Sequence, residues 1–185
     1  MKLTRVLAML SLALGINHAA AADWRLEAAG SRLEFVAMFE KTPAPGVFKD
    51  FDVRLDFDSE KPGGRMDVRI RVASADMASA DINKAIAGAE WFDFTRHQEA
   101  RFQSTDIKRV ASGRYVAHGI LNLKGAQQNV DVPFTWSASA QGATMDGEFI
   151  VKRTPFGIGS GAWAATTTIG ADVAVKFRVR LRKAN

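Results

Sequence analysis

Residues 51–58 of the chain read FDVRLDFD, and residues 65–72 read RMDVRIRV. In both stretches apolar side chains alternate with charged ones without a break. Successive side chains of a strand point to opposite faces, so this alternation predicts two half-buried β-strands. The turn-forming sequence KPGG at 61–64 lies between them and predicts that the two strands form a hairpin.

The same alternation recurs towards the C-terminus, where residues 172–182 read DVAVKFRVRLR. A slip of one residue would turn the charged side chains of this strand into the core, so the pattern also sets its register. Weaker alternation predicts further strands over residues 24–28, 32–39, 100–110, 114–123, 129–139 and 144–151.

One segment departs from the period of two. Ser79 or Asp81 is suited to cap a short helix that places Ile82, Ile86 and Ala89 on one side. No fixed-period repeat or linker divides the chain, which predicts one domain of about nine strands and this helix. Closing a sheet removes its exposed edges. We therefore predict an all-β fold, an antiparallel barrel of about eight strands with one short helix inserted.

The N-terminus is typical of a secretory signal peptide. Residues 1–22 contain Lys2 and Arg5, then an apolar stretch over 6–16 and small residues at 19–22. This predicts cleavage, a domain at residues 23–185 and a periplasmic location. The chain has no Cys, which excludes disulfides and thiolate chemistry. Loss of the two signal-peptide cations lowers the net charge from +5 to +3, too little to favour nucleic acid.

Several local patterns follow one another through nearly the whole mature chain. They are Trp24 with Ser31, Gly46-Val47-Phe48, Trp91-Phe92-Asp93, Ala100-Arg101-Phe102 with Ser104, the stretch 119–125, Arg153, and Phe156-Gly157-Ile158-Gly159. In their order and spacing they resemble the YceI-like family of lipocalin-like, polyisoprenoid-binding periplasmic proteins.

The resemblance implies a long barrel whose apolar channel holds an isoprenoid chain, for lipid transport, storage or stress response. It brings no catalytic residues and requires no cofactor. Some family members are similar in context to b-type cytochromes that handle quinones. The resemblance therefore implies a ubiquinone-like lipid as ligand and a membrane b-type cytochrome as partner, with the protein itself a monomer or a homodimer.

An isoprenoid site consists mainly of apolar area, since each buried methylene contributes about 0.8 kcal/mol. The candidate lining residues are the inward-facing residues of the strands, the aromatic residues of the family pattern, and residues in and after the helix that are placed to gate the channel. They are Phe35, Phe51, Val53, Leu55, Phe57, Met66, Val68, Ile70, Ile86, Trp91, Phe92, Phe102, Leu121, Phe134, Trp136, Phe149, Val175 and Phe177. The same residues also suit a packed core without ligand.

Arg153 lies in the loop-like stretch 152–155 and is the candidate for contact with a quinone oxygen or a phosphate. An exposed position or a structural salt bridge suits this arginine equally well. His97 and His118 are the histidines of the mature chain, and no spacing such as His-x-x-x-His joins them into a metal site. We predict neither a metal nor catalysis.

Three other functions compete with a lipid carrier. A small outer-membrane barrel also alternates apolar and charged residues, with the apolar face outward. Such chains usually end with an aromatic residue, whereas this chain ends with Arg182-Lys183-Ala184-Asn185. An enzyme would use the two histidines with nearby carboxylates. A structural or stress-related domain would have a solid core and bind nothing.

Overall fold

The structure is a computed structural model that describes residues 23–184. The predicted signal peptide, residues 1–22, lies outside the described residues. In chain order the elements are β1 (Asp23–Phe39), β2 (Thr42–Phe48), β3 (Phe51–Asp56), β4 (Arg65–Arg71), η1 (Val72–Ser74), β5 (Ala75–Asp76), α1 (Ala80–Ile86), β6 (Glu99–Ala111), β7 (Arg114–Leu123), β8 (Ala126–Ser139), β9 (Gly142–Lys152), η2 (Thr154–Phe156), η3 (Gly161–Trp163) and β10 (Asp172–Lys183). None of the described helices is long and apolar enough to cross a membrane.

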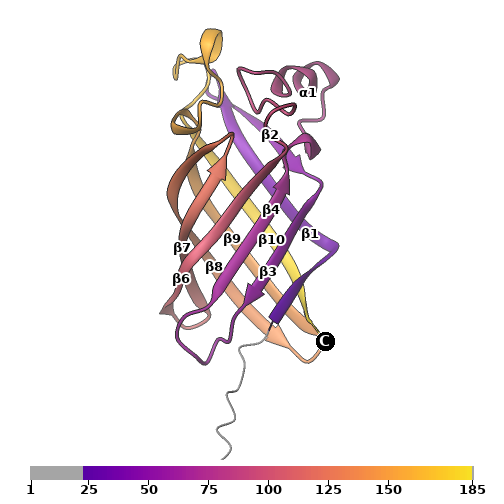
Figure 1. Cartoon of the computed structure of the whole chain (residues 1–185), viewed down its shortest axis with the longest axis vertical. Helices are drawn as coiled ribbons and strands as arrows, with labels where there is room; N and C mark the ends of the chain where they lie inside the picture. Colours follow the sequence, from indigo (N-terminus) through magenta and orange to yellow (C-terminus); the bar gives the residue numbers. More distant parts are fainter. Residues whose placement is uncertain (1–22, 185) are drawn as a thin grey trace, which may run out of the picture.

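The strands form one antiparallel sheet that closes on itself (Figure 1). Its order is β10-β9-β8-β7-β6-β4-β3-β1-β2-β5, and β10 also pairs with β1. Both β2 and β3 pair with β1, so they act as two parts of one strand, and their partners β5 and β4 do the same. The result is a closed barrel with eight strand positions, which confirms the predicted fold.

The stretches of strict alternation form strands as predicted. In β3 the side chains of Val53 and Leu55 are buried, while those of Arg54 and Asp56 are exposed. The predicted helix is also present as α1, and the Ser79 hydroxyl accepts a hydrogen bond from its Ile82 N–H at 3.4 Å. The helix ends at Ile86, earlier than the predicted apolar face extends.

Two features of the first strands differ from the prediction. The stretches 24–28 and 32–39 are one strand, β1, with a bulge where its register to β10 shifts between Glu27 and Arg32. β2 was missed because Pro43 and Pro45 interrupt its pattern. Prolines are tolerated in strands with a free edge. Apart from its short pairing with β5, β2 has such an edge among the described residues.

Aromatic rings fill one end of the barrel, where the β3–β4 and β8–β9 turns lie. Phe57 is central, with ring centroids 4.9 Å from Tyr115, 6.0 Å from Phe134 and 5.1 Å from Trp136. Each such aromatic pair stabilises the fold by about 0.5–1.5 kcal/mol beyond what the burial of its apolar area contributes. Trp24 Nε1 donates a hydrogen bond to the Phe57 carbonyl at 3.0 Å, so its polar atom is satisfied. This end of the lumen is therefore a packed core.

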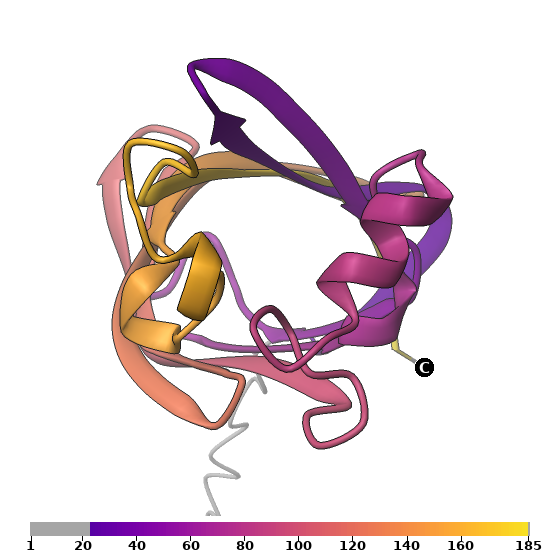
Figure 2. The same ribbon diagram turned by 90° about the horizontal axis from the view of Figure 1, so that it is seen from above.

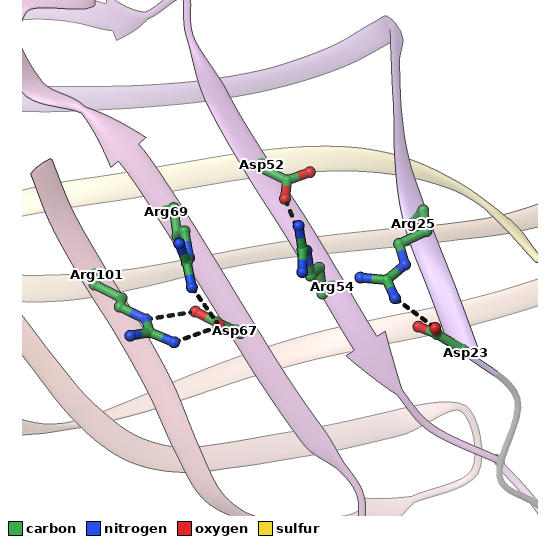
Figure 3. Close-up of polar contacts among 7 residues, drawn as sticks. All are labelled: Asp23, Arg25, Asp52, Arg54, Asp67, Arg69 and Arg101. Atoms are coloured by element: carbon green, nitrogen blue, oxygen red, sulfur yellow. Dashed lines mark hydrogen bonds and ion pairs between the residues drawn. The ribbon is translucent and has the colours of Figure 1, made fainter. Parts of the chain in front are cut away.

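The outer face of the wall carries ion pairs, several of which Figure 3 shows. Arg101 on β6 donates two hydrogen bonds to Asp67 on β4, at 2.8 and 2.6 Å. On β3, Arg54 pairs with Asp52 at 3.3 Å. A barrel that spans the outer membrane presents an apolar band to lipid. This charged wall is the opposite arrangement and counts against the outer-membrane alternative.

We expect Asp67→Asn to lower the free energy of unfolding by about 1 kcal/mol at pH 7, because it removes a two-bond contact between strands. The hydrogen bond from Arg101 holds the pKa of Asp67 below its usual value of 3.8. A carboxyl with a lowered folded-state pKa stabilises the fold above its unfolded pKa, and this stabilisation is lost as the pH falls through the folded pKa. The difference between the two proteins should therefore shrink in acid.

Urea denaturation of wild type and Asp67→Asn at pH 7 and in acid measures this dependence. Asp52→Asn is the matched control, since Asp52 pairs within its own strand and both side chains are about half exposed. A deficit of the Asp67 variant that stays the same in acid would contradict the assignment.

Candidate functional site: an apolar cavity in the barrel

Beyond the aromatic core, the lumen contains a cavity of about 530 Å³. Ligand pockets usually measure roughly 300–1,000 Å³. Its walls are almost entirely apolar: Asp81 and Arg153 are the only ionisable side chains among the described residues that line it. Water in such a cavity would find few hydrogen-bond partners, whereas a hydrocarbon chain would gain apolar contact along its whole length.

Most of the predicted lining residues border this cavity. They are Phe35, Phe51, Val53, Met66, Val68, Ile70, Ile86, Trp91, Phe92, Phe102, Leu121, Phe149, Val175 and Phe177. Four others, Leu55, Phe57, Phe134 and Trp136, face inward but pack in the aromatic core and do not border it. They differ from the first set by their position along the barrel axis, which alternation does not encode. Contact of any of these residues with a ligand stays a prediction.

Further lining residues were not predicted. Some continue the inward faces of strands, and the others come from α1, turns and loops: Leu33, Ala37, Met38, Phe39, Ala44, Phe48, Met77, Asp81, Ile82, Ala85, Ala100, Leu123, Val130, Val132, Met145, Val151, Ile158, Trp163, Ile169, Val173 and Val179. Arg153, the predicted head-group contact, also lines the cavity. The alternation of β10 already places Val173 and Val179 inward, so a signal for these two was available. For the loop residues the sequence holds no comparable signal.

Two segments lie over the open end of the barrel. Figure 2 shows the segment with α1 on one side and the loop with η2 and η3 on the other. Lys124, in the β7–β8 turn, joins them by donating hydrogen bonds to the carbonyls of Ala89 at 2.8 Å and Gly157 at 2.7 Å. The Ser160 N–H donates to the Glu90 carbonyl at 2.9 Å. We call residues 77–98 the helical cap and residues 153–171 the loop cap.

The cavity opens to solvent beside these caps. Phe39 at the tip of β1 is 43% exposed, and Ile82 on α1 is 44% exposed. Both side chains also line the cavity, so they mark its rim. Large apolar side chains at a rim fit an opening through which an apolar ligand passes.

Arg153 organises the loop cap from inside. Its side chain is 3% exposed, and all five of its N–H donors meet backbone carbonyls. Nε donates to the Gly170 carbonyl at 3.0 Å. The two terminal nitrogens donate to the carbonyls of Ile158, Gly159, Trp163 and Ile169, at 2.7–3.1 Å. Burial lowers the pKa of this guanidinium.

The structure therefore places Arg153 differently from the alternatives predicted for it. It is buried, and it forms no ion pair with the described residues. Its contact with a head group stays a prediction, and its donors would first have to leave these carbonyls.

The glycine-rich stretch 157–161 makes this arrangement possible. Gly157, Gly159 and Gly161 have φ values of 65°, 67° and 59°, a region that favours glycine. A Cβ atom at Gly159 would lie 2.6 Å from Arg153 Nη1. The loop therefore needs glycine where its carbonyl approaches the guanidinium.

The two histidines lie apart from the cavity lining. His118 on β7 contacts Asp131 on β8 at 2.6 Å, and His97 lies near Gly125 in the β7–β8 turn. Among residues 23–184, no three His, Cys, Asp or Glu side chains gather in a way that could hold a metal.

The fold and the cavity together define a lipocalin-like antiparallel barrel with an apolar chamber. The chain belongs to the YceI-like family: its residues 24–181 match the family model described as the YceI-like domain, which confirms the predicted resemblance. A UPF0312 protein of Serratia proteamaculans is 26% identical over 90% of this chain and 91% of its own length. A UPF0312 protein of Azotobacter vinelandii is 30% identical over 70% of this chain and 69% of its own length.

Solved structures share the fold. BcnA of Burkholderia cenocepacia is 31% identical, with a TM-score of 0.81 over 84% of this chain and 98% of its own. A polyisoprenoid binding domain from Saccharophagus degradans is 14% identical, with a TM-score of 0.70 over 89% of this chain and 99% of its own. At this identity the likeness concerns the fold alone.

Proposed function

We propose that this protein is exported to the periplasm and holds an isoprenoid lipid in the barrel cavity, where it carries or stores the lipid. The observation that carries the proposal is the cavity of about 530 Å³ with almost entirely apolar walls. A cavity of roughly 150 Å³ already accommodates benzene. The space here is several times larger and suits a chain rather than a single ring.

Membership of the YceI-like family supports an isoprenoid as the ligand. The fold shared with the polyisoprenoid binding domain from Saccharophagus degradans supports it further. Within this proposal the ligand is a prenyl quinone of the ubiquinone type, and a membrane b-type cytochrome is the partner that supplies or receives it. We propose no catalytic step.

The alternative of a solid-core domain without ligand predicts that the inward side chains fill the lumen. They do so at the aromatic end, where Leu55 and Phe57 are 0% and 1% exposed. A second cluster of buried side chains, which includes Phe35 and Val151, packs with residues of both caps. Phe51 and Val68 face the same lumen beside the helical cap and remain partly exposed, although they point inward. The two packed clusters thus leave part of the lumen unfilled, and this part is the cavity.

We expect protein purified from the native periplasmic fraction, without detergent, to carry a stoichiometric prenyl lipid. Mass spectrometry of its organic extract against a mock preparation measures this, and recovery from that fraction tests the predicted export. Protein stripped of lipid should take up an added prenyl quinone. Absence of any lipid, together with no uptake of quinone, would contradict the proposal and favour a domain without ligand.

A further inference from the structure

The cavity has a floor, and the inward residues of the strands mark its level. On β8 the side chain of Val132 lines the cavity, whereas that of Phe134, two residues further on, packs only in the core. On β10 the same change falls between Val179 and Leu181. Val132 and Val179 belong to the core cluster as well as to the lining, so they lie where the core ends and the cavity begins.

Two methionines reach this level from opposite walls. Met66 on β4 is the strand partner of Leu55, and Met145 on β9 is the partner of Trp136. Both partners pack in the core and do not line the cavity, whereas both methionines do. Round the closed barrel, β4 and β9 are four strand positions apart in either direction, so the two side chains project inward from opposite sides. Methionine is long and unbranched and fills irregular gaps, which suits the closed end of a channel.

The polar groups of the lining lie at the other end of the cavity. Asp81 belongs to α1, and Arg153 begins the loop cap; they are the only ionisable side chains among the described residues that line the cavity. Burying a polar group without a hydrogen-bond partner costs free energy, and the floor side chains are apolar. A lipid with one polar end therefore enters with its apolar end first, and this end lies on the floor.

The volume of the cavity limits how much of a chain fits between floor and rim. A cavity of roughly 150 Å³ holds benzene, which corresponds to about 25 Å³ per carbon atom. At that ratio the cavity of about 530 Å³ holds roughly 20 carbon atoms, or about four isoprene units. A longer chain leaves its further units beyond the rim, where they lose little contact with water and gain little apolar burial.

Resting on the proposed function, we infer that the cavity buries about four isoprene units of a chain, and that Met66, Val132 and Met145 set this limit as the floor on which the chain end lies. Affinity then depends on chain length up to this limit and hardly beyond it. The floor residues determine the buried length, while the rim and the caps act on the polar end.

A series of neutral isoprenoid alcohols that differ only in length tests the limit. Geraniol, farnesol, geranylgeraniol and geranylfarnesol contain two, three, four and five isoprene units, and each is titrated with the full mature protein by isothermal titration calorimetry. We expect the affinity of wild type to rise about tenfold or more with each unit up to geranylgeraniol, and by less than about twofold from there to geranylfarnesol. A rise that continues through geranylfarnesol, or one that already stops at farnesol, would overturn the inference.

Two floor variants should move the limit in opposite directions. Val132→Phe adds four carbon atoms at the floor. It should reduce the gain from farnesol to geranylgeraniol to about twofold or less and leave farnesol binding as in wild type. Met145→Ala removes three atoms, so geranylfarnesol should bind at least about fivefold more tightly than geranylgeraniol. Val132→Phe fills open space and avoids the loss of core packing that Met145→Ala brings, so it decides the test if the alanine variant does not fold.

Phe39→Ala is the control, because Phe39 lines the cavity at its rim and not at its floor. It should leave the limit at geranylgeraniol. A limit that stays at geranylgeraniol in the folded Val132→Phe protein as well would show that these residues do not form the floor. If all four alcohols bind and no limit is found, the inference fails and the proposed function stands. If none of them binds wild type, both fail.

Discussion

Replacing Arg153 with methionine is expected to lower the free energy of unfolding by more than about 3 kcal/mol. Methionine keeps an unbranched apolar stem but leaves the carbonyls of Ile158, Gly159 and Ile169 without donors, all of them in buried residues. Each unsatisfied buried carbonyl costs about 1–3 kcal/mol. Thermal denaturation followed by circular dichroism should show the melting temperature falling by roughly 6–12 °C.

Two further variants separate the carbonyl contacts from charge. Arg153→Lys keeps the charge but offers three donors from a single nitrogen, so it should recover part of the loss and not all of it. Arg178→Met removes an exposed arginine that pairs with Asp146, and it should change the melting temperature little. Equal melting temperatures for the Arg153→Met and Arg178→Met proteins would show that the carbonyl contacts do not hold the fold.

The same contacts link stability to the cavity. Arg153 binds the carbonyls of Ile158, Trp163 and Ile169, and the side chains of these three residues line the cavity. The arginine therefore acts on any ligand through the loop cap that it holds in place. This role explains a buried arginine beside an apolar chamber without requiring that it touch the ligand.

Strand alternation accounts for much of the barrel. It predicts which side chains of β3, β4 and β10 turn inward, because the two faces of a strand differ in polarity. It does not predict how far along the barrel axis a side chain lies. Val53 and Leu55 are consecutive inward residues of β3, yet Val53 borders the cavity and Leu55 packs only in the core. The boundary between core and cavity depends on which side chains meet from opposite strands, and that information is not local.

Arg153 shows the same limit for the caps. A charged residue followed by Thr154 and Pro155 predicts a solvated loop, since the local sequence contains no apolar pattern. Arg153 becomes buried because the chain up to Gly170 folds back around it. The glycines at 157–161 were the available signal, since a glycine-rich stretch lets backbone carbonyls approach a cation closely.

Val130→Trp is expected to reduce lipid binding roughly 100-fold while leaving the barrel folded. Val130 on β8 is half-buried although it lies on the inward face, because its side chain borders the cavity. The added indole has open space to occupy and so avoids the strain of overpacking. If it displaces four methylenes of a bound chain, the ligand loses about 3 kcal/mol of apolar burial, which corresponds to roughly 100-fold in affinity.

Asn129→Trp is the matched control, since it places the same indole on the adjacent, outward-facing residue of β8. Titration with squalene reports the apolar channel without any contribution from a head group. The control protein should bind squalene as wild type does, and both variants should melt within a few degrees of wild type. Wild-type squalene affinity in Val130→Trp would show that the chain does not occupy this part of the lumen. It would place the bound lipid nearer the rim formed by Phe39 and Ile82.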